Sequence, residues 1–365
     1  MITFAENISK KMVIPKFLNP SGSFHAELRK RVNNYFTEIK AQPTGNSKLF
    51  IKAIILTVVL IATYVHLVFF QYHWAVGVLD CLILAAATAA IGFNIMHDGA
   101  HGSFSQINWL NNLAGLSLNF LGANVFMWKT KHNVVHHTYT NVDGIDDDID
   151  ARPFLRLCQT QKKYKIHKFQ YIYFPLAYSL LYLYWIFFTD YEKYFTKKVG
   201  NMPIKKMNRK EHISFWGFKL LHLILFVIIP IIKVGFAHWI IGFLIFGFFT
   251  GLIISLVFQL AHTVESTQFP EMNEVGKMPD EWAVHQIKTT ANFATENKIV
   301  SWFTGGLNFQ VEHHLFPNVS HIHYPQLNKI VKSVCEEYNV QFNEYKKFSE
   351  ALSSHISHLR NMGVA

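Results

Sequence analysis

Four long apolar runs alternate with polar stretches along the chain. They cover about residues 53–71, 75–96, 215–233 and 237–261, and each is long enough to cross a bilayer as a helix. The first and third runs are each followed by a very short connection, so each pair of runs predicts a hairpin. The pattern therefore predicts an all-α integral membrane protein with four transmembrane helices in two hairpins.

Two further apolar runs are less suited to crossing a membrane. Residues 107–128 contain five asparagines, and residues 169–189 contain five tyrosines together with Pro175 and Trp185. Amide side chains are poor neighbours for lipid tails, whereas tyrosine and tryptophan are enriched at the headgroup boundary. We expect both runs to be interfacial or re-entrant.

The composition agrees with residence in a membrane. Of the 365 residues, 50% are hydrophobic and only 16% are charged. The net charge of +10 comes from basic segments that flank the apolar runs, which is typical of the positive-inside bias and not of a nucleic-acid-binding module. The three cysteines are far apart in the sequence and predict neither a disulfide framework nor a thiolate metal site.

These observations divide the chain into three parts. We expect a basic cytoplasmic leader over 1–48, a membrane domain over 49–342 and a polar C-terminal tail over 343–365. Within the membrane domain, apolar residues recur at helical spacing among charged ones between 324 and 338. This predicts an amphipathic helix that packs on a cytoplasmic helical cap.

Histidines gather at the ends of the apolar runs. His97 and His101 are four residues apart, as are His132 and His136, so each pair projects from one face of a helix. Burying so many imidazoles is costly unless a bound metal uses them. The candidate metal ligands are His97, His101, His132, His136, His137, His262, His313 and His314.

Eight imidazoles supply about four ligands to each ion of a two-metal site. Imidazole suits zinc, copper, iron and nickel, so the residues alone do not select the metal. With four spans, all the histidine segments lie on one side of the membrane. We expect that side, both termini and both basic loops to be cytoplasmic.

An acidic loop, residues 143–150, follows the second histidine segment. It is either a solvated turn or a source of carboxylates that hydrogen-bond the free nitrogens of ligating imidazoles.

The three histidine segments, H-x-x-x-H, H-x-x-x-H-H and Q-x-x-H-H in this order, resemble those of the membrane fatty acid desaturases. The resemblance covers about residues 50–340 and is closest to the front-end acyl desaturases, in which Gln310 stands where other members have histidine. It implies two non-haem iron ions held by the eight histidines and O2 as co-substrate. The implied reaction removes two hydrogens from adjacent methylenes of an acyl chain, of the linoleoyl type, and leaves a cis double bond.

The resemblance also implies partners for the ligands and for the enzyme. Gln310 is either a weak ligand or, as we favour, a hydrogen-bond partner of a ligand, and we expect Glu312 and Asn308 to be such partners. Asp98 is a further candidate partner, but a loop-capping role is favoured for it. The leader has no His-Pro-Gly-Gly haem motif, so we expect an external electron donor, a ferredoxin or cytochrome b5. The acyl substrate is carried by coenzyme A, acyl carrier protein or a glycerolipid. The expected location is a bacterial inner membrane, with the endoplasmic reticulum as the alternative.

Two other classes compete with this interpretation. A membrane diiron hydroxylase or ketolase would use a similar histidine cage to insert oxygen into a lipid or carotenoid. A metal transporter would instead place histidines or carboxylates along a path inside the spans, where the sequence offers only the scattered His66, His222 and His238.

Overall fold

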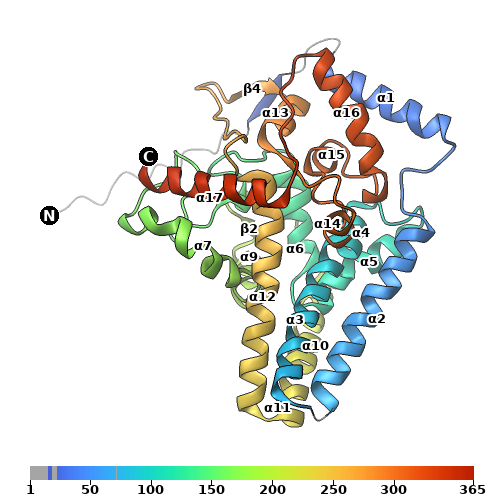
Figure 1. Cartoon of the computed structure of the whole chain (residues 1–365), viewed down its shortest axis with the longest axis vertical. Coiled ribbons are helices and arrows are strands. Elements are labelled where there is room, and N and C mark those ends of the chain that lie inside the picture. The colour runs from blue at the N-terminus through green and yellow to red at the C-terminus, as the bar shows by residue number, and fades with distance from the viewer. Residues whose placement is uncertain (1–14, 19–22, 71) are drawn as a thin grey trace.

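The computed structural model describes residues 15–18, 23–70 and 72–365 (Figure 1). Much of the predicted leader, and residue 71 at the end of the first predicted span, lie outside the described residues. Helices dominate the described part of the chain, and the strands within it form three two-stranded pairs.

Four helical segments of the described residues are long and apolar enough to cross a membrane, which confirms the predicted number. They are Ser47–Phe69, Trp74–His101, Arg209–Val234 and Phe236–His262. Each is longer than its apolar run because the helix continues into polar residues at its end. A fifth candidate, Lys165–Ser179 with Leu181–Thr196, is bent by 53° at its middle.

The spans contain several helical elements. The first is α2 (Ser47–Phe69), and the second joins α3 (Trp74–Ile91), a π-helical turn (Gly92–Met96) and α4 (His97–His101). The third joins α10 (Arg209–Leu223), a π-helical turn (Ile224–Ile228) and α11 (Ile229–Val234), and the fourth is α12 (Phe236–His262).

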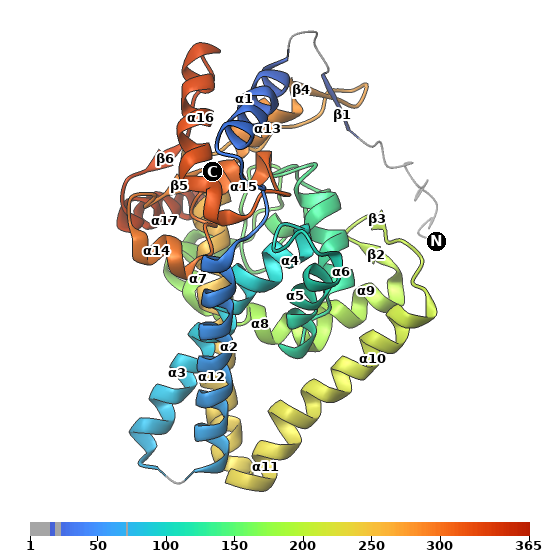
Figure 2. The same cartoon turned by 90° about the vertical axis from the view of Figure 1, so that its right-hand side faces the viewer.

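The second span is the centre of the membrane part, since α3 packs against both α2 and α12. In contrast, α10 leans away from α12 and meets it only near α11, at the far end of the molecule (Figure 2). The two helical pairs are therefore built differently, the first closed and the second splayed.

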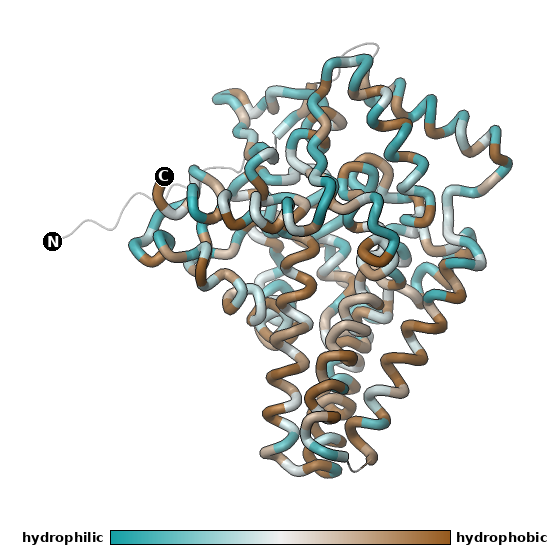
Figure 3. Tube along the Cα trace, in the orientation of Figure 1, coloured by the Kyte–Doolittle hydropathy of each residue, from teal (hydrophilic) through white to brown (hydrophobic). Residues whose placement is uncertain are grey.

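The hydrophobic part of the chain is concentrated in these helices (Figure 3). The outer face of α2 carries exposed Ile51, Ile54 and Val58. Such a face is stable against lipid tails and would be costly in water.

The two runs with polar composition form shorter helices. α5 (Asn108–Phe120) packs against α4, and α6 (Val125–Lys129) leads into a π-helical segment, Thr130–His136. The tyrosine-rich run forms α7 (Gln170–Ser179), α8 (Leu181–Tyr184), a π-helical turn (Trp185–Thr189) and α9 (Asp190–Thr196). α7 and α8 pack on α12.

A helical cap covers the end of the spans that carries the histidines (Figures 1 and 2). It contains α1 (Phe24–Glu38), α13 (Trp282–Thr289), α14 (Lys298–Phe303), α15 (Gln310–Leu315) and α16 (Tyr324–Glu337). The predicted amphipathic helix is α16, whose Leu327, Val331 and Val334 are buried. The strand pairs are β1 (Lys16–Leu18) with β4 (Lys277–Glu281), β2 (Lys198–Val199) with β3 (Met202–Pro203), and β5 (Asn292–Phe293) with β6 (Glu344–Tyr345).

The last residues do not form the polar tail that we expected. They contain α17 (Phe348–Val364), which buries Ala351, His355 and Leu359 against α7 and α12. The buried face also contains serine and histidine side chains, so it does not stand out as an apolar stripe in the sequence.

Candidate metal centre

The first histidine pair lies where the second span enters the cap. The π-helical turn Gly92–Met96 precedes α4, and the rings of His97 and His101 have centroids 4.7 Å apart. Gly99 lets α4 approach α5 closely, because a Cβ at this position would lie 2.5 Å from the Cβ of Ala114. The pair therefore shares one face, as the spacing predicted.

The second histidine segment is π-helical, whereas α-helical spacing was the basis for pairing His132 with His136. The amide of His137 donates to the carbonyl of His132 at 3.0 Å, which is the five-residue step of a π-helix. The wider turn places both His136 and His137 beside His132, with ring centroids 5.2 and 4.7 Å away. π-Helical turns often mark functional sites.

The third segment is α15, which begins at Gln310 and holds His313 and His314. Gly305 has φ +60° just before it, and a Cβ there would lie 2.5 Å from the carbonyl oxygen of Phe93. Glycine is therefore required for the loop to approach the second span.

Seven of the eight predicted ligands form two clusters, and the eighth lies between them. Cluster A consists of His97, His101, His132 and His313, and cluster B consists of His136, His262 and His314. Within each cluster, one ring nitrogen from each residue lies within 4.8 Å of the others. His137 groups with His313 and His314 and so lies between the clusters.

The nitrogen positions fit metal ligation. Two imidazole nitrogens bound to one ion at about 2.1 Å are roughly 3 to 3.4 Å apart at angles between about 90° and 109°. Nε2 of His132 is 3.3 Å from Nε2 of His97 and 3.2 Å from Nε2 of His137. Four ring nitrogens of the candidate ligands are buried without a hydrogen-bond partner among the described residues: His101 Nε2, His136 Nε2, His137 Nδ1 and His313 Nε2. Buried polar atoms are normally paired, so these nitrogens suit an ion.

The environment keeps most of these imidazoles neutral, as ligation requires. Burial, together with the neighbouring histidines, holds the pKa of His137, His313 and His314 well below the usual value. Burial also lowers the pKa of His136, but the nearby Asp146 and Asp148 carboxylates outweigh it and leave that pKa raised.

Hydrogen bonds orient the rings of cluster B from behind. His136 Nδ1 donates to Asp146 at 2.9 Å, and His314 Nδ1 donates to Gln286 Oε1 at 2.8 Å. His262 Nδ1 donates to the carbonyl of Thr289 at 3.3 Å. The Nε2 atoms are therefore not engaged by these supports, and the acidic loop contributes a carboxylate partner through Asp146.

The Gln310 side chain lies next to the Nε2 atoms of cluster B, which are the atoms that would bind an ion. Its Nε2 lies 2.9 Å from His262 Nε2 and 3.2 Å from His314 Nε2. Its Oε1 has no hydrogen-bond partner among the described residues. Gln310 Nε2 thus lies within hydrogen-bond distance of two candidate ligands of cluster B.

The side chains of the other expected hydrogen-bond partners bond mainly to further side chains and to none of the candidate ligand imidazoles. Glu312 accepts hydrogen bonds from Asn292 and Asn328, and Asp98 accepts from Ser320 and His321. Asn308 bonds to Thr304, Ser301 and the Ala294 carbonyl. Sequence reasoning did not single out Gln286, Thr289 and Tyr324, the last of which bonds His313 Nδ1 at 3.1 Å. No spacing signal marks them, because they come from other segments.

A narrow apolar cavity of about 30 Å³ reaches cluster A from the membrane side. His97 lies in its wall together with residues of α3, α5, α8 and α12, among them Leu118, Tyr182 and Phe258. The cavity therefore places His97 of cluster A beside apolar side chains.

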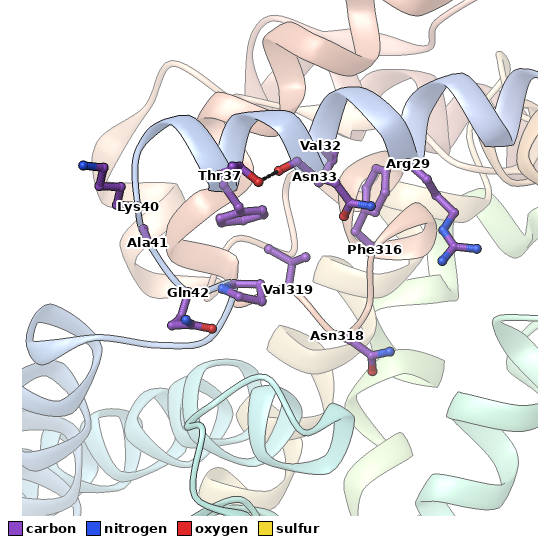
Figure 4. A pocket seen from close by; sticks show the side chains of 12 residues that line it. Arg29, Val32, Asn33, Thr37, Lys40, Ala41, Gln42, Phe316, Asn318 and Val319 are labelled. Atoms are coloured by element: carbon purple, nitrogen blue, oxygen red, sulfur yellow. Dashed lines mark hydrogen bonds between the residues drawn. The ribbon is translucent and has the colours of Figure 1, made fainter.

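A second, larger groove lies on the cap. It has a volume of about 590 Å³ and runs between α1 and the loop that follows α15 (Figure 4). Arg29 and Lys40 stand at its two ends, Asn33 and Asn318 line it between them, and none of the described residues in its lining carries a carboxylate.

Four apolar spans under a cap with two buried histidine clusters define a membrane protein with a centre suited to two metal ions. The fatty acid desaturase family profile matches residues 72–346, and the chain belongs to this family. It is 37% identical over 354 residues to the sn-1 linoleoyl-lipid 6-desaturase of Synechocystis sp., covering 96% of this chain and 98% of that protein. It is 34% identical to the enzyme of the same name from Arthrospira platensis, over 93% of each chain. It is also 34% identical to the acyl-lipid (8-3)-desaturase of Physcomitrium patens, over 93% of this chain and 72% of that protein.

Proposed function

We propose that this protein is a front-end desaturase that inserts a cis double bond into a lipid-linked, linoleoyl-type acyl chain, on the carboxyl side of an existing double bond. The observation that carries the proposal is the meeting of a buried histidine cage with an apolar cavity at His97. The names of the similar proteins, linoleoyl-lipid and acyl-lipid desaturases, support this choice of substrate.

The eight histidines would hold two non-haem iron ions, in clusters A and B. Iron bound there supplies the activation of O2 that cleavage of an unactivated C–H bond needs. Overall, O2, two electrons and two protons from a donor, and two hydrogens from adjacent methylenes give one double bond and two waters. The protein must therefore receive electrons from a reduced partner.

The residues of the chain position the acyl tail and keep the site dry. The cavity wall near cluster A consists of Leu118, Ala123, Tyr182 and Phe258, which accept methylenes and exclude water. Tyr182 donates to the carbonyl of Leu121 at 2.7 Å, and this hydrogen bond fixes one side of the wall. The position of the new double bond depends on how far the chain passes this wall.

The groove on the cap suits the polar head of a lipid substrate. Three amide side chains line it together with apolar side chains, a cation stands at each end, and it lies beside the loop directly after the third histidine segment. These features favour a glycerolipid with an anionic or sugar-bearing head.

We further propose that the cap and both termini are cytoplasmic in a bacterial inner membrane. An acidic donor, a ferredoxin or cytochrome b5, would then meet a basic surface. Basic residues are frequent from the end of α9 to the first turn of α10, at Lys197, Lys198, Lys205, Lys206, Arg209 and Lys210.

Expression in a host fed linoleic acid tests the activity. The expected product, identified by mass spectrometry of derivatives that locate double bonds, is a trienoic acid with a new cis bond on the carboxyl side. The His136→Ala variant controls for host enzymes. A hydroxylated product would show that the enzyme is a hydroxylase and not a desaturase. The absence of any product when ferredoxin and cytochrome b5 are supplied would overturn the proposal.

A further inference from the structure

Asn141 connects the supports of two ligands without touching either imidazole. Its side chain is fully buried, and its backbone has φ +59°, a conformation that asparagine and glycine adopt most readily. It lies in the turn between the second histidine segment and the acidic loop.

The backbone of Asn141 supports His136. Its amide donates to Asp146 Oδ2 at 2.8 Å, and the same carboxylate accepts the hydrogen bond from His136 Nδ1. The Asp146 side chain is therefore held between the imidazole that it orients and the backbone of Asn141.

The side chain of Asn141 supports His262. Its Nδ2 lies 2.9 Å from the carbonyl of His262, 3.1 Å from that of Gln268 and 3.2 Å from that of Thr289. The Thr289 carbonyl also accepts from His262 Nδ1. Asn141 thus fixes both the main chain of His262 and the acceptor that orients its ring.

The preceding residue extends this arrangement to the third ligand of cluster B. Thr140 Oγ1 is 2.8 Å from Gln286 Oε1, which accepts from His314 Nδ1. Residues 140 and 141 together therefore reach the supports of all three cluster B histidines. The hydrogen bonds of the Asn141 side chain go to segments that hold cluster B and to none that hold cluster A.

We propose that Asn141 is a positioning residue that couples His136 to His262 and sets the metal affinity of cluster B separately from that of cluster A. This inference rests on the proposed two-metal function. Loss of a hydrogen-bond partner behind a ligand typically lowers metal affinity by roughly 10- to 100-fold. We expect a loss of that size, confined to one of the two ions.

The variants separate the side chain from the backbone. Asn141→Gly keeps the left-handed backbone available and removes the three carbonyl contacts. Asn141→Asp keeps the shape but presents an oxygen to three carbonyl oxygens.

Asn343→Ala is the matched control. Asn343 is also a buried asparagine that donates to two main-chain carbonyls, those of Ile287 and Thr290, and its Oδ1, like that of Asn141, has no partner among the described residues. Neither carbonyl belongs to a candidate ligand.

The measurement is metal content per purified full-length chain, by mass spectrometry, together with titration of the metal-free protein with Co²⁺ followed by absorption. We expect about two ions in the wild type and in Asn343→Ala. In both Asn141 variants we expect one site of unchanged affinity and one weakened by roughly 10- to 100-fold.

Three outcomes would overturn the inference: both sites unchanged in the Asn141 variants, both sites weakened equally, or the same loss in Asn343→Ala. A wild type that binds two ions but forms no double bond would contradict the proposed activity and would not contradict the inference about Asn141. A wild type that binds fewer than two ions would contradict both the proposed activity and the inference.

Discussion

Clusters A and B are both buried histidine cages, but they are surrounded differently. Cluster A has four imidazoles, stacks Trp128 on His132 with centroids 4.3 Å apart, and touches the apolar cavity through His97. Cluster B has three imidazoles and Gln310, and each of its rings is hydrogen-bonded from behind. Cluster A is therefore the one next to an apolar cavity, while cluster B is the one whose imidazoles are all held by polar groups.

The largest effect is expected from removal of a cluster A ligand. His313→Ala should lower activity by more than the roughly 100-fold that loss of a supporting hydrogen bond can cost, and should reduce iron content. The reason is that His313 belongs to cluster A and also groups with His137 between the clusters. Activity in membranes and iron per chain are the measurements. A variant with normal iron content would contradict the ligand assignment.

The next largest effect is expected from a support of cluster B. Asp146→Asn replaces the carboxylate that accepts from His136 Nδ1 with an amide of the same shape. We expect activity to fall by roughly 10- to 100-fold, with the iron loss confined to one site. Asp150→Asn is the control, because Asp150 pairs with exposed Arg152. Equal effects in the two variants would show that Asp146 has no specific role in orienting His136.

Gln310→His tests whether cluster B works with a fourth imidazole. The side chain already faces Nε2 of His262 and of His314, so a histidine there has ligand partners within reach. We expect the variant to retain iron and at least about a tenth of its activity, a loss within the range of a changed ligand support. A folded variant without iron would show that the amide itself is required.

A change in the cavity should separate substrate binding from metal binding. Ala123→Leu adds volume to the wall near cluster A, where Ala123 is almost fully buried. We expect iron content to be unchanged and the preference for longer over shorter acyl chains to fall by about tenfold, the effect of misfitting one or two methylenes. Competition between fed acids of different length measures this ratio. An unchanged ratio would mean that the tail does not pass this wall.

The sequence predicted the parts of the site that local spacing determines. Four apolar runs, the paired histidines and the amphipathic α16 were readable because each signal lies within one segment. The π-helical form of the second histidine segment could not be read from the sequence, because α-helical spacing is far commoner than the five-residue step of a π-helix. The supports Gln286 and Thr289 depend on long-range packing of α13 against the histidine segments, which periodicity does not report.

The smallest effect concerns the helix behind cluster B. His355 of α17 is fully buried, with Nδ1 2.7 Å from the carbonyl of Thr263, the residue after His262, and Nε2 2.9 Å from the hydroxyl of Tyr178. Burial lowers the pKa of His355 to about 4. In the unfolded chain the pKa is about 6.5. The unfolded chain therefore takes up a proton that the folded protein does not, and the free energy of unfolding falls as pH decreases from about 6.5 to about 4.

His355→Gln removes the titrating group and with it this pH-dependent change in the free energy of unfolding, which is of the order of 1–3 kcal/mol at its full extent. Thermal unfolding in detergent should show a lower melting temperature for the variant at pH 7.5 and a shallower decline between pH 6.5 and pH 4.5. The exposed His238 provides the control variant, His238→Gln, which should follow the wild type. If His355→Gln declines as steeply as the wild type, the pH dependence comes from other groups, and α17 supports the His262 end of cluster B through packing and not through a neutral imidazole.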